Sequence, residues 1–201
     1  MPDTYLTIAQ LNVLFQAMIL DILGYEKTGS PADYSNAAYA AVRVAWPTYG
    51  APAWKVSEDV TFIHVTEEDE PINRQREFVY TESLLGETLL DEEVSYTRVI
   101  GLNLIFYGPT SFHNAQLVRD GVFRETYRRV LSQNKIFLIP DIVAPRRAPE
   151  PFQSQWWERT DLDLTFNEKI KKTDEISIIE IADIIVVTDT GQEEEITVTA
   201  E

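Results

Sequence analysis

Residues 98–121, RVIGLNLIFYGPTSFHNAQLVRDG, combine an apolar run, a Gly-Pro break and a Ser-led segment with helical spacing. A strand that turns sharply into a helix N-terminus is where phosphates and nucleophiles are often held. A nucleophile elbow requires Gly-x-Ser-x-Gly, and a phosphate loop requires Gly-x-x-x-x-Gly-Lys followed by Ser or Thr. This sequence has GPTSF and contains no Gly-Lys pair. We therefore interpret Ser111 as a helix cap.

Histidine and acidic residues give little further indication of catalysis. His64 and His113 are the only histidines, and a Ser-His-Asp arrangement would have to bring distant elements together. Acidic pairs such as Glu67-Glu68 are so frequent in this chain that a charged turn is the simpler interpretation. We predict no catalytic residue, cofactor or metal. A hydrolase or small-ligand binder that uses Ser111 and His113 is kept as an alternative.

Composition limits the class of protein. The 201 residues carry 33 acidic and 17 basic side chains, a net charge of −16, and no cysteine. Such a chain is unsuited to gripping a phosphate backbone, and it has no disulfides or thiolate metal ligands. The apolar N-terminal run is interrupted by polar residues such as Gln10 and Asp21, so we expect neither a signal peptide nor a membrane span.

The first helix is expected between Thr7 and Leu23, with Thr4 or Thr7 as its cap and Gly24 as its stop. Its apolar residues recur three and four positions apart and form one broad face. A second stripe lies roughly opposite and consists of Ala9, Val13, Ala17 and Leu20. This helix is therefore either buried within its own domain or used in a subunit contact.

Short strands are expected at 41–46, 61–65 and 136–139, while 78–85 fits either an extended segment or a helical turn. The strongest strand is 95–107, apolar on both faces towards its end, as in a central strand covered on both sides. A helix is expected over 112–131, where Gly121 costs about 1 kcal/mol unless something packs closely against it.

The C-terminal third is rich in strand signals. A Pro-rich loop at 144–151 should be stiff and extended, and a long hairpin is expected from strands 161–172 and 175–190 that meet near Lys171 to Asp174. A bulge or break could fall at Ala182-Asp183. An acidic arm at about 190–201 is either a frayed end or a partner-binding segment. These elements predict one α+β domain over 1–201, with a mixed or antiparallel sheet packed by the N-terminal and central helices.

Basic and aromatic residues are the candidates for an interface. The basic residues either pair with carboxylates of their own chain or meet acidic patches on a neighbouring copy. Trp156 and Trp157 are either core residues or interface anchors. Together with the second stripe of the first helix, the candidate interface residues are Val13, Ala17, Leu20, Arg119, Arg124, Arg128, Arg129, Arg146, Arg147, Trp156 and Trp157.

The segment 98–121 resembles the neck terminator or tail terminator proteins of tailed bacteriophages. In that family an apolar strand ends in a Tyr-Gly-Pro-x-Ser-Phe turn, followed by a helix that contains an Arg. The matching residues here are Arg98, Gly101, Tyr107, Gly108, Pro109, Ser111, Phe112, Ala115 and Arg119. The order of the other elements agrees with the family over most of the chain.

The resemblance implies a small α+β protomer that assembles, usually as a hexamer, into a ring at the head-proximal end of the tail. The ring ends tail-tube polymerisation and offers a docking surface to the head-completion or connector proteins. The expected partners are therefore further copies of the chain, the tube protein and the connector proteins, with DNA only passing through and no membrane. Another neck or baseplate component of the same virion is the alternative within this class.

Overall fold

The computed structural model describes residues 5–26, 34–46, 52–82, 89–177, 181–187 and 193–199. The chain divides into two compact units, which we call the larger and the smaller unit. The larger unit contains Tyr5–Gln75 and Tyr96–Ile170, and the smaller one contains Met1–Thr4, Arg76–Ser95 and Lys171–Glu201. The mixed α+β class is confirmed, whereas the expectation of one domain over residues 1–201 stays a prediction.

Helix α1, Ile8–Ile22, has the expected start and stop. The Thr7 hydroxyl accepts the Gln10 N–H at 3.3 Å, and the Gln10 side chain accepts the Thr7 N–H at 2.9 Å, which makes a capping box. Gly24 follows with φ +79°, a conformation that favours glycine and ends the helix.

The main sheet is mixed, with strand order β1-β2-β4-β9-β5. β1 is parallel to β2, and the other pairs with described registers are antiparallel. β3 pairs with β4, and β6 pairs with β9. The strands of this sheet are Val42–Val44 (β1), Val60–Glu67 (β2), Glu77–Glu82 (β3), Leu89–Tyr107 (β4), Ile136–Leu138 (β5), Arg146–Arg147 (β6) and Arg159–Ser177 (β9).

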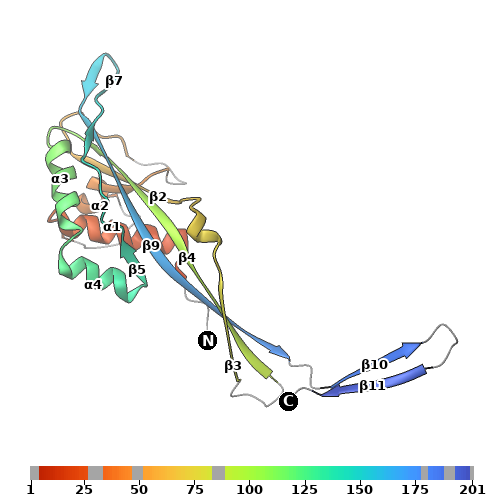
Figure 1. The fold of residues 1–201 in the computed structure, drawn as a ribbon. Helices are drawn as coiled ribbons and strands as arrows, with labels where there is room; N and C mark the ends of the chain where they lie inside the picture. The colour runs from red at the N-terminus through yellow and green to blue at the C-terminus, as the bar shows by residue number, and fades with distance from the viewer. Residues whose placement is uncertain are drawn as a thin grey trace. The chain divides into compact units, whose positions relative to one another are not determined.

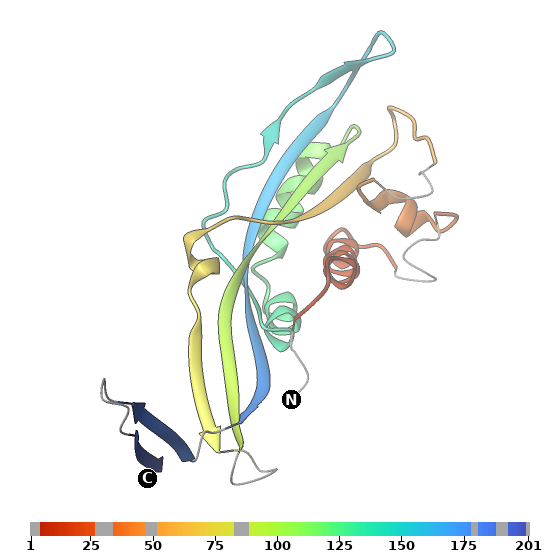
Figure 2. The same ribbon diagram turned by 90° about the vertical axis from the view of Figure 1, so that its right-hand side faces the viewer.

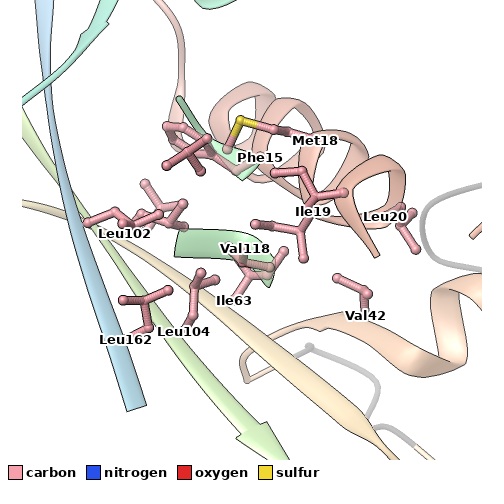
Figure 3. Packing of buried hydrophobic residues seen from close by; sticks show 14 of the residues in the cluster. Phe15, Met18, Ile19, Leu20, Val42, Ile63, Leu102, Leu104, Val118 and Leu162 are labelled. Atoms are coloured by element: carbon pink, nitrogen blue, oxygen red, sulfur yellow. The ribbon is translucent and has the colours of Figure 1, made fainter. Parts of the chain in front are cut away.

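In the larger unit, α1, α3 (Ser111–Gly121) and α4 (Glu125–Gln133) lie on the same side of β4 and β9 (Figures 1 and 2). Phe15 of α1 packs on Phe166 of β9, with ring centroids 4.9 Å apart. Figure 3 shows how α1, α3, β2 and β4 direct apolar side chains into this core. The opposite face of β4 is only partly buried, so the expected double cover is incomplete.

The expected helix over 112–131 is wrong, because the segment forms α3 and α4 with a break between them. A Cβ at Gly121, the last residue of α3, would lie 2.6 Å from Cγ2 of Ile22, so the glycine lets α3 approach α1 closely. Val122 is fully buried just beyond it, and Arg124 is extended. The close packing that the sequence required at Gly121 is therefore present, but the chain turns there.

Other segments refine the expectations. A five-residue helix, α2 (Ala37–Ala41), precedes β1. Of the segment 78–85, β3 shows 78–82 to be extended, and 83–85 lie outside the described residues. A 3-10 helix, η1 (Pro71–Arg74), lies between β2 and β3. The Pro-rich segment 144–151 contains β6 and the start of β7 (Glu150–Phe152), which pairs with β8 (Gln155–Trp157).

The expected turn near Lys171 to Asp174 is wrong, because β9 continues through it. Lys171 Nζ lies 2.6 Å from the Glu93 carboxylate on β4, so a polar stretch that looks like a turn belongs to a paired strand. The C-terminal hairpin is formed instead by β10 (Ile181–Val187) and β11 (Glu193–Thr199), which pair antiparallel. Ala182-Asp183 lies within β10. Residues 178–180 and 188–190 of the predicted strand, and residues 190–192 and 200–201 of the predicted arm, lie outside the described residues.

Candidate assembly surfaces

Ser111 and His113 are not brought together as a catalytic pair. Ser111 is buried, and its hydroxyl lies 3.3 Å from that of Thr160 and accepts its hydrogen bond, while His113 is exposed. The N-cap position belongs to Thr110 and not to Ser111, which corrects the cap assignment. In the described ranges, no cluster of three or more His, Asp or Glu residues is placed to hold a metal ion.

Gly108 is fixed by its surroundings. It has φ +107°, and a Cβ there would lie 2.6 Å from the Glu58 carbonyl oxygen and 2.5 Å from the Asp59 carboxylate. Its N–H donates to the Glu158 carbonyl at 3.1 Å. The Asp59 carboxylate in turn accepts the N–H and hydroxyl of Thr110, at 2.9 and 2.7 Å. Gly108 therefore anchors the strand-to-helix turn, and its role is structural.

Other residues of the signature differ in their burial. Gly101 is buried, and a Cβ there would lie 2.1 Å from Oε1 of Glu68, so a larger residue would displace that side chain. Pro109 and Phe112 are exposed on either side of the buried Ser111. The signature thus marks the end of β4 as scaffold, with Phe112 as its one exposed aromatic residue.

Tyr107 connects the end of β4 to the β7–β8 hairpin. Its hydroxyl donates to Oε1 of Glu150 at 2.7 Å, and Arg159 binds the other oxygen of that carboxylate at 3.0 Å. Burial, and then the hydrogen bond to Glu150, raises the pKa of Tyr107 to about 12. The hydrogen bond with Asp161 is the main cause that raises the pKa of Arg159. This network holds the base of the hairpin.

The two adjacent tryptophans have different environments. Trp157 is partly buried, and its ring lies 5.8 Å from that of Trp54 and 6.4 Å from that of Tyr107. Trp156 is 71% exposed and is paired across the hairpin with Pro151. The hairpin tip is Gln153-Ser154, both with positive φ, as a two-residue type I′ turn requires. Trp157 is thus a packing residue, and Trp156 remains a candidate for an interface.

The second stripe of α1 divides between core and surface. Leu20 is fully buried, so its assignment to an interface is corrected. Val13 is 50% exposed, and Ala17 is partly buried. Both line an open groove of about 530 Å³, which we call the α1 groove; its other lining residues are Leu6, Ala9, Gln10, Leu14 and Asn134.

Three of the arginines proposed for an interface bind within their own chain. Arg119 donates to the Ile142 carbonyl at 3.1 Å. Arg146 pairs with Asp161 at 3.4 Å and Arg147 with Glu158 at 2.8 Å. Arg119, which is partly buried, thus has a structural contact, while the other two follow the local-pair interpretation and keep exposed surface. The assignment of all three to an interface stays a prediction.

The remaining arginines lie on or just before α4. Arg128 is 63% exposed and approaches Glu125 at 3.8 Å, whereas Arg124 and Arg129 are exposed and make no ion pair among the described residues. Arg128 and Arg129 line a hollow of about 520 Å³ between α4 and β5, which we call the α4–β5 groove. Apolar residues form most of its other walls.

Sequence reasoning missed a buried ion pair. Glu168 is 1% exposed, and it accepts Nε of Arg98 at 2.8 Å, Nη2 of the same guanidinium, and the Leu6 N–H at 2.9 Å. Arg98 also donates to the Leu6 carbonyl at 2.7 Å, so the pair ties β4 and β9 to the start of α1. The available signal was the alternation of β9, which places Glu168 on the same face as Leu164 and Phe166.

Arg43 is a second buried cation that the sequence did not indicate. Its guanidinium donates to the carbonyls of Ala40 and Pro52 and lies 5.6 Å from the ring centre of Trp54. Burial is the main cause that lowers its pKa. Because its partners are backbone carbonyls and an aromatic ring, no acidic spacing in the sequence could have revealed it.

The described part of the chain thus combines an α+β fold and a buried apolar core with a signature turn fixed by its surroundings and two open grooves. Residues 9–191 match the family described as phage neck terminator protein, so the chain belongs to that family of structural proteins of the bacteriophage neck. No individual curated protein gave a match. Among the described helices, none is long and apolar enough to cross a membrane.

Proposed function

We propose that the chain forms a homo-oligomeric ring, a hexamer, at the head-proximal end of a phage tail. There it ends polymerisation of the tail tube and joins the tail to the head-completion or connector proteins. The observation that carries this proposal is the α1 groove, where Val13 is half exposed on a helix that also supplies Leu11, Phe15 and Ile19 to the core. A monomer would leave this apolar strip in water, whereas a subunit contact would cover it.

Charge supports the path proposed for DNA. With a net charge of −16, the surface of a ring repels a polyanion, so DNA can slide through the channel without being bound. Family membership supports the position of the protein in the virion neck. The protein would take up that position when virions assemble in the host cytoplasm.

Native mass spectrometry of the purified protein tests the ring directly. The unmodified chain should give a closed oligomer, and Val13→Asp should dissociate it, because a charge would be buried in the subunit contact. Gln116→Asp is the matched control, since Gln116 is exposed on α3 and does not line the α1 groove. A chain that stays monomeric at every concentration would overturn the proposal.

Position in the virion is a separate test. Cryo-electron microscopy of particles carrying a tagged chain should show the tag at the head-proximal end of the tail. A tag at the distal tip would instead support the baseplate alternative.

A further inference from the structure

The α4–β5 groove has a composition unusual for this acidic chain. Its floor contains the buried Leu131 and Ile136, and its rim contains Phe123 and Phe137, which are 44% and 49% exposed. Two arginines stand on the α4 side, and Glu125 is the one acidic residue in the lining. The groove therefore suits an extended segment that is both apolar and acidic.

β5 also lies at the end of the sheet order, so one of its edges has no strand beside it in the described part of the chain. The Lys135 carbonyl accepts the Lys169 N–H at 3.0 Å, and the Ile139 N–H donates to the Thr165 carbonyl at 2.9 Å. Because alternate residues of a strand direct their backbone groups to the same side, Leu138 directs its N–H and C=O away from β9. An extended chain in the groove can hydrogen-bond there.

The C-terminal hairpin has the complementary composition. β10 and β11 form a separate two-stranded sheet, and such a hairpin is marginally stable in water without further packing. Their register places Ala182 opposite Val198 and Ile184 opposite Ile196. β11 begins with the acidic run Glu193–Glu195. In sequence, β11 therefore combines acidic with β-branched residues, and the α4–β5 groove combines basic with apolar ones.

We propose that β11 of one copy docks in the α4–β5 groove of a neighbouring copy. The acidic run at Glu193–Glu195 faces Arg128 and Arg129, and the apolar residues that follow cover the rim phenylalanines. With 7 residues, β11 spans about 24 Å, enough to cross the roughly 13 Å length of the 9-residue α4. The contact joins two different surfaces, as a head-to-tail ring requires, and it rests on the proposed homo-oligomer.

Charge reversal tests the electrostatic part. Replacing Glu193–Glu195 with lysines, or Arg128 and Arg129 with glutamates, should each raise the dissociation constant of the oligomer on the order of tenfold or more. Combining both sets should restore most of the affinity, because the complementary charges are then exchanged. Arg74→Glu is the control, since Arg74 is exposed elsewhere in the larger unit. Unchanged rings with either set of reversals would overturn the docking.

Cross-linking tests whether β11 lies near the α4–β5 groove. It also shows whether the two belong to neighbouring copies or to the same copy. The chain has no cysteine, so Thr197→Cys and Ser132→Cys can be placed on separate chains, mixed, and treated with a short bismaleimide. We expect a covalent dimer from this mixture, and none when Gln116→Cys replaces Ser132→Cys. Cross-linking only inside a chain that carries both cysteines would overturn the exchange between copies.

The two proposals fail in different ways. If native mass spectrometry shows only monomers of the unmodified chain, the proposed ring is wrong. If the ring is present but neither the reversals nor the cross-links behave as expected, only the docking of β11 is wrong. A ring that persists after deletion of residues 178–201, with undiminished affinity, would also exclude the docking.

Discussion

Replacing Arg98 with Met should lower the free energy of unfolding by about 3–5 kcal/mol, the usual cost of removing one partner of a buried ion pair. Arg98 makes two hydrogen bonds to the Glu168 carboxylate and one to the Leu6 carbonyl. In the variant, Glu168 keeps only the Leu6 N–H among these contacts, although it is 1% exposed. Glu67, 3.8 Å from Arg98, is about half exposed and adds little.

Urea unfolding followed by tryptophan fluorescence is the appropriate assay, because the four tryptophans and both members of the pair lie in the larger unit. With a denaturant dependence of about 3 kcal/mol per molar urea, the midpoint should fall by about 1 M or more. Arg74→Met is the control: Arg74 binds both oxygens of Asp69 at 2.8 and 2.9 Å, but both side chains are exposed. Its loss should cost less than about 1 kcal/mol.

A double variant, Arg98→Met with Glu168→Leu, distinguishes the cost of leaving a buried charge unpaired from the cost of leaving the backbone groups of Leu6 without hydrogen-bond partners. It should recover part of the loss, because no buried charge is left unpaired. It should stay about 1–3 kcal/mol below the unmodified protein, since the N–H and C=O of Leu6 lose their partners. If Arg98→Met costs no more than Arg74→Met, the role assigned to the buried pair is refuted.

Three further predictions concern the end of β4 and the β7–β8 hairpin beside Tyr107. Gly108→Ala should destabilise the protein by about 3 kcal/mol or more in urea unfolding, because its Cβ meets backbone at 2.6 Å, whereas Gly24→Ala, with nothing within 4 Å, should cost about 1–2 kcal/mol from its positive φ alone. The pKa of Tyr107 is raised to about 12 from 10.0, so its contribution to stability is full below pH 10 and is lost as the pH rises towards 12. Tyr107→Phe should therefore flatten the dependence of the free energy of unfolding on pH between these values. In an absorbance titration at alkaline pH, the variant should lack one of the tyrosines that ionise at the highest pH. Trp157→Ala should cost about 3 kcal/mol by urea unfolding, and Trp156→Ala less than about 0.5 kcal/mol; equal losses would contradict the assigned burial.

The elements that the sequence predicted correctly are those whose periodicity reflects burial on one face. Alternation along 95–107 and the helical spacing of 7–23 identified β4 and α1, since each buries most of one face. The break at Gly121 was missed because the local sequence remains compatible with a helix. The close approach of α1 to Gly121 is a tertiary contact with Ile22, which lies about a hundred residues away in the sequence.

The turn expected near Lys171 failed for a different reason. A polar stretch such as Lys171 to Asp174 is equally compatible with a turn and with a strand whose faces both meet solvent. In the structure the stretch belongs to β9, a neighbour of β4 in the sheet, and Lys171 pairs with Glu93 of β4. Composition alone does not show which strands pair. The hairpin was therefore predicted from strands 161–172 and 175–190, whereas β10 and β11 form it.

The candidate interface shows the same limit within a single helix. Val13, Ala17 and Leu20 form one stripe of α1, and their residue types do not distinguish buried from exposed positions. Gln16, one turn before Leu20, donates to the Val42 carbonyl at 2.8 Å, so β1 covers that part of the stripe and Leu20 is buried. Among the described residues no such cover reaches Val13, which is 50% exposed. An apolar stripe therefore marks a potential interface only where no element of the same chain lies over it, and that depends on contacts between elements distant in sequence.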